Sequence, residues 1–135
     1  MSKLSISSGV LTCFVGFIYM SGLFGQVESE VITWGLLLAL LGGLSIFFEL
    51  LEDKTKRLKV INSFILHIIV LLQLLPIYLW FSYYGISISD GTPSNSFVAH
   101  YLFAVPHIAT IILCLLSLYP LIKAKKDPLI KSKKA

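Results

Sequence analysis

The sequence predicts an all-α membrane protein, an antiparallel bundle of four transmembrane helices. Its 135 residues are 56% hydrophobic and only 13% charged, whereas about a quarter of the residues in soluble domains are charged. The mean hydropathy is +0.87. Charged residues are absent from four long stretches, at 4–25, 31–48, 60–88 and 92–122. These observations exclude disordered chains, nucleic-acid-binding modules and disulfide-rich scaffolds.

Each uncharged stretch is long enough to cross the hydrocarbon core, which takes about 20 apolar residues of helix. We expect spans at about 4–25, 31–51, 60–84 and 97–122, and a basic tail at 123–135. The links between the spans are short and turn-rich. Short links place consecutive helices side by side in opposite directions, so residues 1–135 are expected to form a single transmembrane domain.

Lysine and arginine fall on one side of these spans. Lys3 precedes the first span, and the remaining ten lie in the second link and after the fourth span: Lys54, Lys56, Arg57, Lys59, Lys123, Lys125, Lys126, Lys131, Lys133 and Lys134. The positive-inside rule assigns this side to the cytoplasm. Both termini are therefore expected in the cytoplasm, with the chain in the plasma (inner) membrane as a multi-pass protein.

Two further features bear on location. Aromatic residues gather at the opposite, outer boundary as an aromatic belt: Trp34, Trp80, Tyr83, Tyr84, Phe97 and Tyr101. The last five residues, 131–135, resemble a dilysine tail that returns eukaryotic proteins to the endoplasmic reticulum. The endoplasmic reticulum membrane is thus the alternative location if the chain is eukaryotic, and a simple polybasic tail beside anionic lipid is the other interpretation.

Polar and small residues repeat at helical spacing within each span. Lipid tails are as apolar as leucine, so such residues are expected to face other helices. The predicted inward faces are Ser5, Gly9, Thr12, Gly16 and Tyr19; Gly35, Gly42, Ser45, Glu49 and Glu52; Asn62, Gln73, Pro76, Trp80 and Tyr83; and His100, His107, Thr110, Cys114 and Ser117.

Gln73 and His107 lie near the centres of their spans, within about 2–3 Å of the same height at helical rise. Pro76 and Pro106 lie at similar heights, and each removes an N–H that a carbonyl of its helix would use. With Tyr19 of the first span, these residues form the candidate ligand-binding cluster. Polar groups inside a membrane indicate function, although a Gln–His hydrogen bond that only joins two helices explains the pattern equally well.

Glu49 is the one acidic residue expected inside a span. His67 lies at a similar height in the cytoplasmic half, so the two side chains are a candidate proton relay. The alternative is that Glu49 extends to the interface and pairs with Lys54, Lys56 or Arg57.

Catalytic chemistry has little support in the sequence. Cys13 and Cys114 lie in separate spans, and no nucleophile triad, phosphate-binding loop or zinc-protease motif is present. His67 and His107 differ in height by roughly 11 Å, too far apart for a shared haem or metal. We therefore expect no enzyme activity, no catalytic residue, no metal site, no cofactor and no nucleic-acid partner.

Three functions fit these features. The first is a non-catalytic accessory, regulatory or immunity-type component that binds another membrane protein, or another copy of itself, through helix contacts. The second is a dimeric transporter or channel for a small solute or ion. The third is a binder of a lipid-soluble ligand, such as a quinone or a sterol, near Gln73 and His107.

Overall fold

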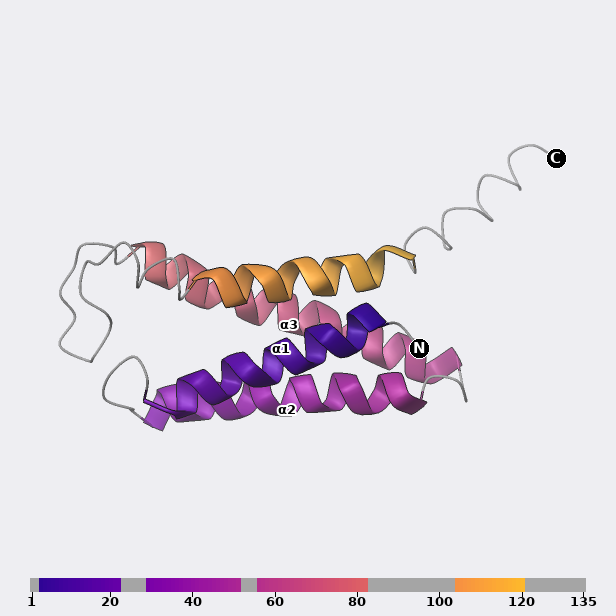
Figure 1. The fold of residues 1–135 in the computed structure, drawn as a ribbon, viewed down its shortest axis with the longest axis horizontal. Helices are drawn as coiled ribbons and strands as arrows, with labels where there is room; N and C mark the ends of the chain where they lie inside the picture. The colour runs from indigo at the N-terminus through magenta and orange to yellow at the C-terminus, as the bar shows by residue number, and fades with distance from the viewer. Residues whose placement is uncertain (1–2, 23–28, 52–55, 83–103, 121–135) are drawn as a thin grey trace.

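The computed structural model describes residues 3–22, 29–51, 56–82 and 104–120, and these segments form four helices. The helices are α1 (Lys3–Met20), α2 (Ser29–Leu51), α3 (Lys56–Ser82) and a fourth, Ala104–Pro120, drawn in orange in Figure 1. The first three are long and apolar enough to cross a membrane, and the fourth is shorter as described. The prediction of a helical protein with segments long and apolar enough to cross a membrane is confirmed for these residues.

The boundaries of α1, α2 and α3 fall within five residues of those expected from the sequence. The first predicted span ends early, because the chain turns at residues 21–22 and Gly22 adopts a positive φ of 70°. Glycine adopts this left-handed conformation without steric cost, so it commonly ends a helix. The remaining parts of the fourth predicted span, residues 97–103 and 121–122, lie outside the described residues.

Helices α1 and α2 are in backbone contact through four glycines. A Cβ added to Gly16 would lie 2.5 Å from the carbonyl oxygen of Gly35, and one added to Gly42 would lie 2.6 Å from the carbonyl oxygen of Gly9. Both distances are far below van der Waals contact, so only glycine permits this approach. Because Gly16 meets Gly35 while Gly9 meets Gly42, the two helices run in opposite directions.

Polar contacts connect α2 to α3 and α3 to the fourth helix. Ser45 of α2 contacts Asn62 of α3, and Gln73 of α3 contacts His107 of the fourth helix. Helices α2 and α3 meet near Ser45 and Asn62 and diverge toward their other ends, where α3 runs beside the Ala104–Pro120 helix (Figure 1).

Polar side chains make up much of the interior. A small apolar cluster joins α3 to the fourth helix through Ile65, Leu66, Ile69, Cys114 and Leu118. The buried polar side chains are Ser5, Ser8, Thr12, Ser45, Glu49, Asn62, Gln73, His107, Thr110 and Ser117. The exposed surface carries many large apolar residues, among them Phe14, Leu40, Phe64, Leu71 and Tyr119. This distribution matches the predicted inward faces and suits a lipid environment.

The glycine contact predicts different effects for two adjacent substitutions. Gly42→Ala would force a methyl group against the Gly9 carbonyl and should lower the free energy of unfolding by about 1–3 kcal/mol, as overpacking does. A Cβ at Gly43 would meet nothing within 4 Å, so Gly43→Ala should be neutral or stabilise by up to about 1 kcal/mol through helix propensity. Denaturation by SDS followed by circular dichroism measures both; equal destabilisation would contradict the contact.

Candidate functional site

Three of the predicted site residues meet inside the bundle. The hydroxyl of Tyr19 lies 3.1 Å from Nε2 of His107, and Oε1 of Gln73 contacts Nδ1 of the same imidazole. The rings of Tyr19 and His107 are tilted at 56° with centroids 5.7 Å apart. His107 is 2% exposed and Gln73 is fully buried. The cluster therefore joins α1, α3 and the fourth helix.

The hydrogen-bonding roles follow from the acceptor on Gln73. Because Oε1 only accepts, Nδ1 of His107 must carry a proton. A neutral imidazole protonated there leaves Nε2 to accept from the Tyr19 hydroxyl. This arrangement uses the carbonyl of the Gln73 amide and leaves its NH₂ group unused. Nε2 of Gln73 is buried and meets no hydrogen-bond partner in the described part of the chain.

Trp34 supplies a second buried donor of the same kind. Its indole Nε1 is buried and likewise meets no partner among the residues that the structure describes. Trp34 precedes Ser45 by eleven residues, and Gln73 follows Asn62 by eleven residues. Eleven residues are about three helical turns, so Trp34 and Gln73 return to the facing sides of α2 and α3 that carry Ser45 and Asn62. The sequence had suggested only an aromatic-belt residue at this position.

The two prolines have different positions in their helices. Pro76 is buried within α3, one turn beyond Gln73, and leaves the carbonyl of Leu72 without its helical donor. Pro106 lies in the first turn of the described Ala104–Pro120 helix, where proline is tolerated. Its carbonyl accepts a hydrogen bond of 2.8 Å from Thr110 Oγ1. The partner expected for Pro106, Leu102, lies outside the described residues.

A second polar cluster lies at the other end of the bundle. Nδ2 of Asn62 donates to Oε2 of Glu49 at 3.0 Å and to Oγ of Ser5 at 3.1 Å, while Ser45 Oγ donates to Asn62 Oδ1 at 3.0 Å. Glu49 is only 2% exposed. Asn62 thus bonds the carboxylate inside the bundle, while Lys54 and the side chain of Lys56, two of the partners expected at the interface, lie outside the described residues.

Glu49 and His67 are not brought together. His67 is exposed, and its Nδ1 lies 2.7 Å from the carbonyl oxygen of Ser63 on its own helix. Glu49 faces Asn62 in the interior instead. The structure thus gives no geometric support for the Glu49–His67 relay.

Most other buried hydroxyls bond within their own helix. Each donates to a backbone carbonyl three or four residues earlier, at 2.7–2.8 Å: Ser8 to Ser5, Thr12 to Ser8, Thr110 to Pro106, and Ser117 to Leu113. Such bonds satisfy the hydroxyl without another helix. These residues consequently have a structural explanation and need no ligand.

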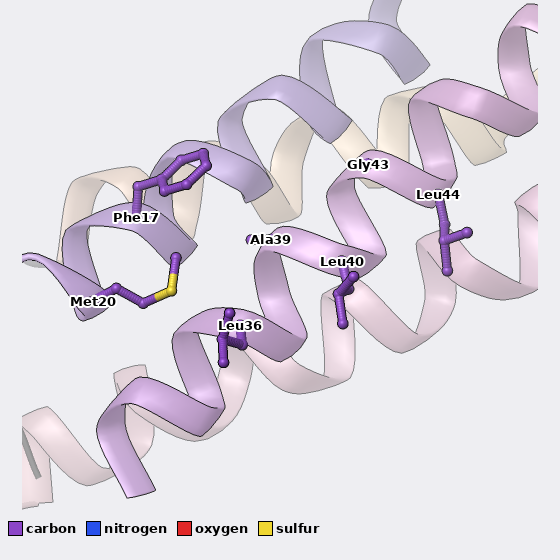
Figure 2. Close-up of a pocket in the computed structure, with 7 residues that line it drawn as sticks. All are labelled: Phe17, Met20, Leu36, Ala39, Leu40, Gly43 and Leu44. Atoms are coloured by element: carbon purple, nitrogen blue, oxygen red, sulfur yellow. The ribbon is translucent and has the colours of Figure 1, made fainter. Parts of the chain in front are cut away.

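An apolar groove of about 380 Å³ lies on the outer face of α1 and α2 (Figure 2). Phe17 and Met20 of α1 form one wall. The α2 side consists of leucines and two small residues: Leu36, Leu40, Leu44, Ala39 and Gly43. The groove is distinct from the polar cluster around His107, since none of its lining residues belongs to that cluster.

Within the described residues, no group of three or more His, Cys, Asp or Glu side chains could hold a metal ion. The predicted inward residues Glu52, Tyr83 and His100 lie outside the described residues, and the side chain of Trp80 is not described. Comparison with models of known protein families, with curated proteins and with solved structures finds no match.

The Tyr19 contact is testable with a matched pair of variants. Tyr19→Phe removes the hydroxyl that meets His107 and should lower the free energy of unfolding by about 0.5–1.5 kcal/mol. It should also shift the ¹⁵N resonance of His107 Nε2. Tyr78→Phe is the control, because Tyr78 is 68% exposed. Unchanged imidazole resonances in Tyr19→Phe would contradict the hydrogen bond.

Proposed function

We propose that this chain is a non-catalytic membrane component, of the accessory, regulatory or immunity type, that binds another membrane protein through helix contacts. It crosses the plasma membrane four times as an antiparallel bundle with both termini in the cytoplasm. The partner places one transmembrane helix in the groove between α1 and α2. The observation that carries this proposal is the position of Gly43.

Among the described residues, Gly43 has no neighbour that requires a glycine at this position. Glycine in a helix interior costs about 1 kcal/mol relative to alanine. Gly9, Gly16, Gly35 and Gly42 offset that cost through the contact of α1 with α2, but a Cβ at Gly43 would meet nothing within 4 Å. Gly43 and Ala39 lie one turn apart on the groove surface. Small residues at this spacing let the backbone of a neighbouring helix approach closely.

The shape of the groove favours a different protein over a second copy. A two-fold dimer brings the same patch of both copies together. The grooves of the two copies would then face each other, and neither would be filled. The side chains that protrude from a single apolar helix would fill the groove beside Phe17 and Leu40 instead. We therefore assign the groove to a helix of another membrane protein.

The interior supports a role without catalysis. Glu49 is bonded by Asn62, and His107 lies between Tyr19 and Gln73. These side chains join helices within the bundle, as buried polar groups commonly do in membrane proteins. Glu49 and His107 thereby contribute to the packing of the helices against each other.

The distribution of basic residues supports the proposed orientation. Lys3 is the first residue of α1, and Lys59 lies in the first turn of α3. The contact of Asn62 with Ser5 brings these two helix starts to the same end of the bundle. Basic residues at one end are retained in the cytoplasm.

Filling the groove should abolish partner binding without unfolding the chain. Gly43→Leu places a leucine where the partner helix would lie and should reduce recovery of the partner, captured in mild detergent, by about tenfold or more. Ser7→Leu is the matched control, since Ser7 is exposed on α1 and lies outside the groove. Quantitative mass spectrometry of the captured proteins measures the effect.

Two outcomes would contradict the proposed partner. One is capture of the same proteins by the parent chain and by Gly43→Leu in equal amounts. The other is a homodimer that is detected by cross-linking in the parent chain and lost in Gly43→Leu, because the groove would then bind a second copy.

The orientation predicts opposite labelling of two introduced cysteines. In a background with Cys13 and Cys114 replaced by serine, a membrane-impermeant maleimide should label Asp90→Cys on intact cells. It should label Ser132→Cys only after permeabilisation, because the lysine-rich tail is cytoplasmic. Labelling of both positions under the same condition would contradict the four-span topology.

A further inference from the structure

Nε2 of Gln73 and Nε1 of Trp34 are buried donors without a partner in the described part of the chain. A partner helix in the outer groove does not account for them, because neither residue lines that groove. A buried N–H without a partner destabilises the fold, and in the described part of the chain these are the two buried side-chain polar atoms left without one. The remaining buried polar residues bond to each other or to their own helices. The unsatisfied atoms thus occur on α2 and α3, each eleven residues along its helix from the Ser45–Asn62 contact and toward the same end of the bundle.

We propose that these two donors bind a lipid-soluble carbonyl compound of the quinone class. Gln73 and Trp34 would donate to its oxygen atoms, beside the paired rings of Tyr19 and His107. This site lies inside the bundle and is separate from the outer groove assigned to a partner helix.

The donor set selects the chemistry of the ligand. Gln73 and Trp34 offer only N–H groups here, because Gln73 Oε1 is occupied by His107 and indole is a donor only. The ligand must therefore present acceptor oxygens. The nearest lysine or arginine described on α3, Lys59, precedes Gln73 by fourteen residues, about 21 Å at helical rise. An uncharged carbonyl consequently suits the site better than an anion.

The surroundings favour a ring-shaped apolar molecule. Tyr19 and His107 present aromatic rings at this level, and Trp34 adds an indole. A Cβ added to Gly35, next to Trp34, would lie 3.0 Å from Cβ of Tyr19. This contact places Tyr19 against the same part of α2. Aromatic side chains with a few directed polar groups are typical of sites for such ligands.

The fluorescence of Trp34 provides a direct test. The chain has two tryptophans, so Trp80→Phe leaves Trp34 as the sole emitter. In lipid nanodiscs, titration with decylubiquinone should give a saturable quenching of Trp34 above the linear, collisional component. Gln73→Leu in this background should weaken the apparent affinity about three- to tenfold, as loss of one hydrogen bond does. Leu74→Ala, at an exposed neighbouring position, should leave it unchanged.

A second variant, Trp34→Phe, tests the proposal without relying on correct folding of Gln73→Leu. Trp34→Phe preserves an aromatic ring and removes only the indole N–H. Decylubiquinone should raise the unfolding temperature of the parent chain, as a ligand of the native state does, and should raise that of Trp34→Phe by less. Linear quenching with no thermal shift in the parent chain would overturn the proposal. A response of equal size in the parent and in both variants would overturn it too. Neither result affects the capture experiment, which tests the partner-helix proposal separately.

Discussion

Backbone contact between α1 and α2 is the constraint on which the interior of this protein depends. Four glycines bring the two helices so close that an added methyl group would overlap a carbonyl oxygen. With α1 held there, Ser5 at one end reaches Asn62, and Tyr19 at the other end reaches His107. A wider spacing of the first two helices would therefore disturb both polar clusters at once.

The sequence was sufficient to predict the helices, their inward faces and the height of the central cluster. These follow from local rules: the length of an apolar run, the 3.6-residue repeat and the rise per residue. Gln73 and His107 were expected at one level on facing helices, and the structure brings them into contact. The ligand-binding role assigned to them remains a proposal.

The partners of Glu49 and Trp34 could not be predicted in the same way. Height and face do not determine how two helices cross or which rotamer a long side chain adopts. Glu49 lies near a helix end, where extension toward basic residues is the expected behaviour. The structure shows it 2% exposed and bonded to an amide N–H of Asn62 on the neighbouring helix, a contact that height and face alone did not predict. The sequence predicts Trp34 as a residue of the aromatic belt at the membrane interface, whereas its indole nitrogen is buried in the structure.

The hydroxyl groups that bond to their own helices have a consequence for biogenesis. Helices carrying Ser8, Thr12, Thr110 or Ser117 bring those groups into lipid already satisfied. Helix α3 carries amides that need other helices: Asn62 bonds to segments synthesised earlier, whereas Gln73 bonds to a segment synthesised later. During translation, α3 would therefore enter the bilayer with the amide of Asn62 hydrogen-bonded and that of Gln73 still without its partner. The bond of Gln73 would form only after the fourth helix emerges from the ribosome and packs against α3.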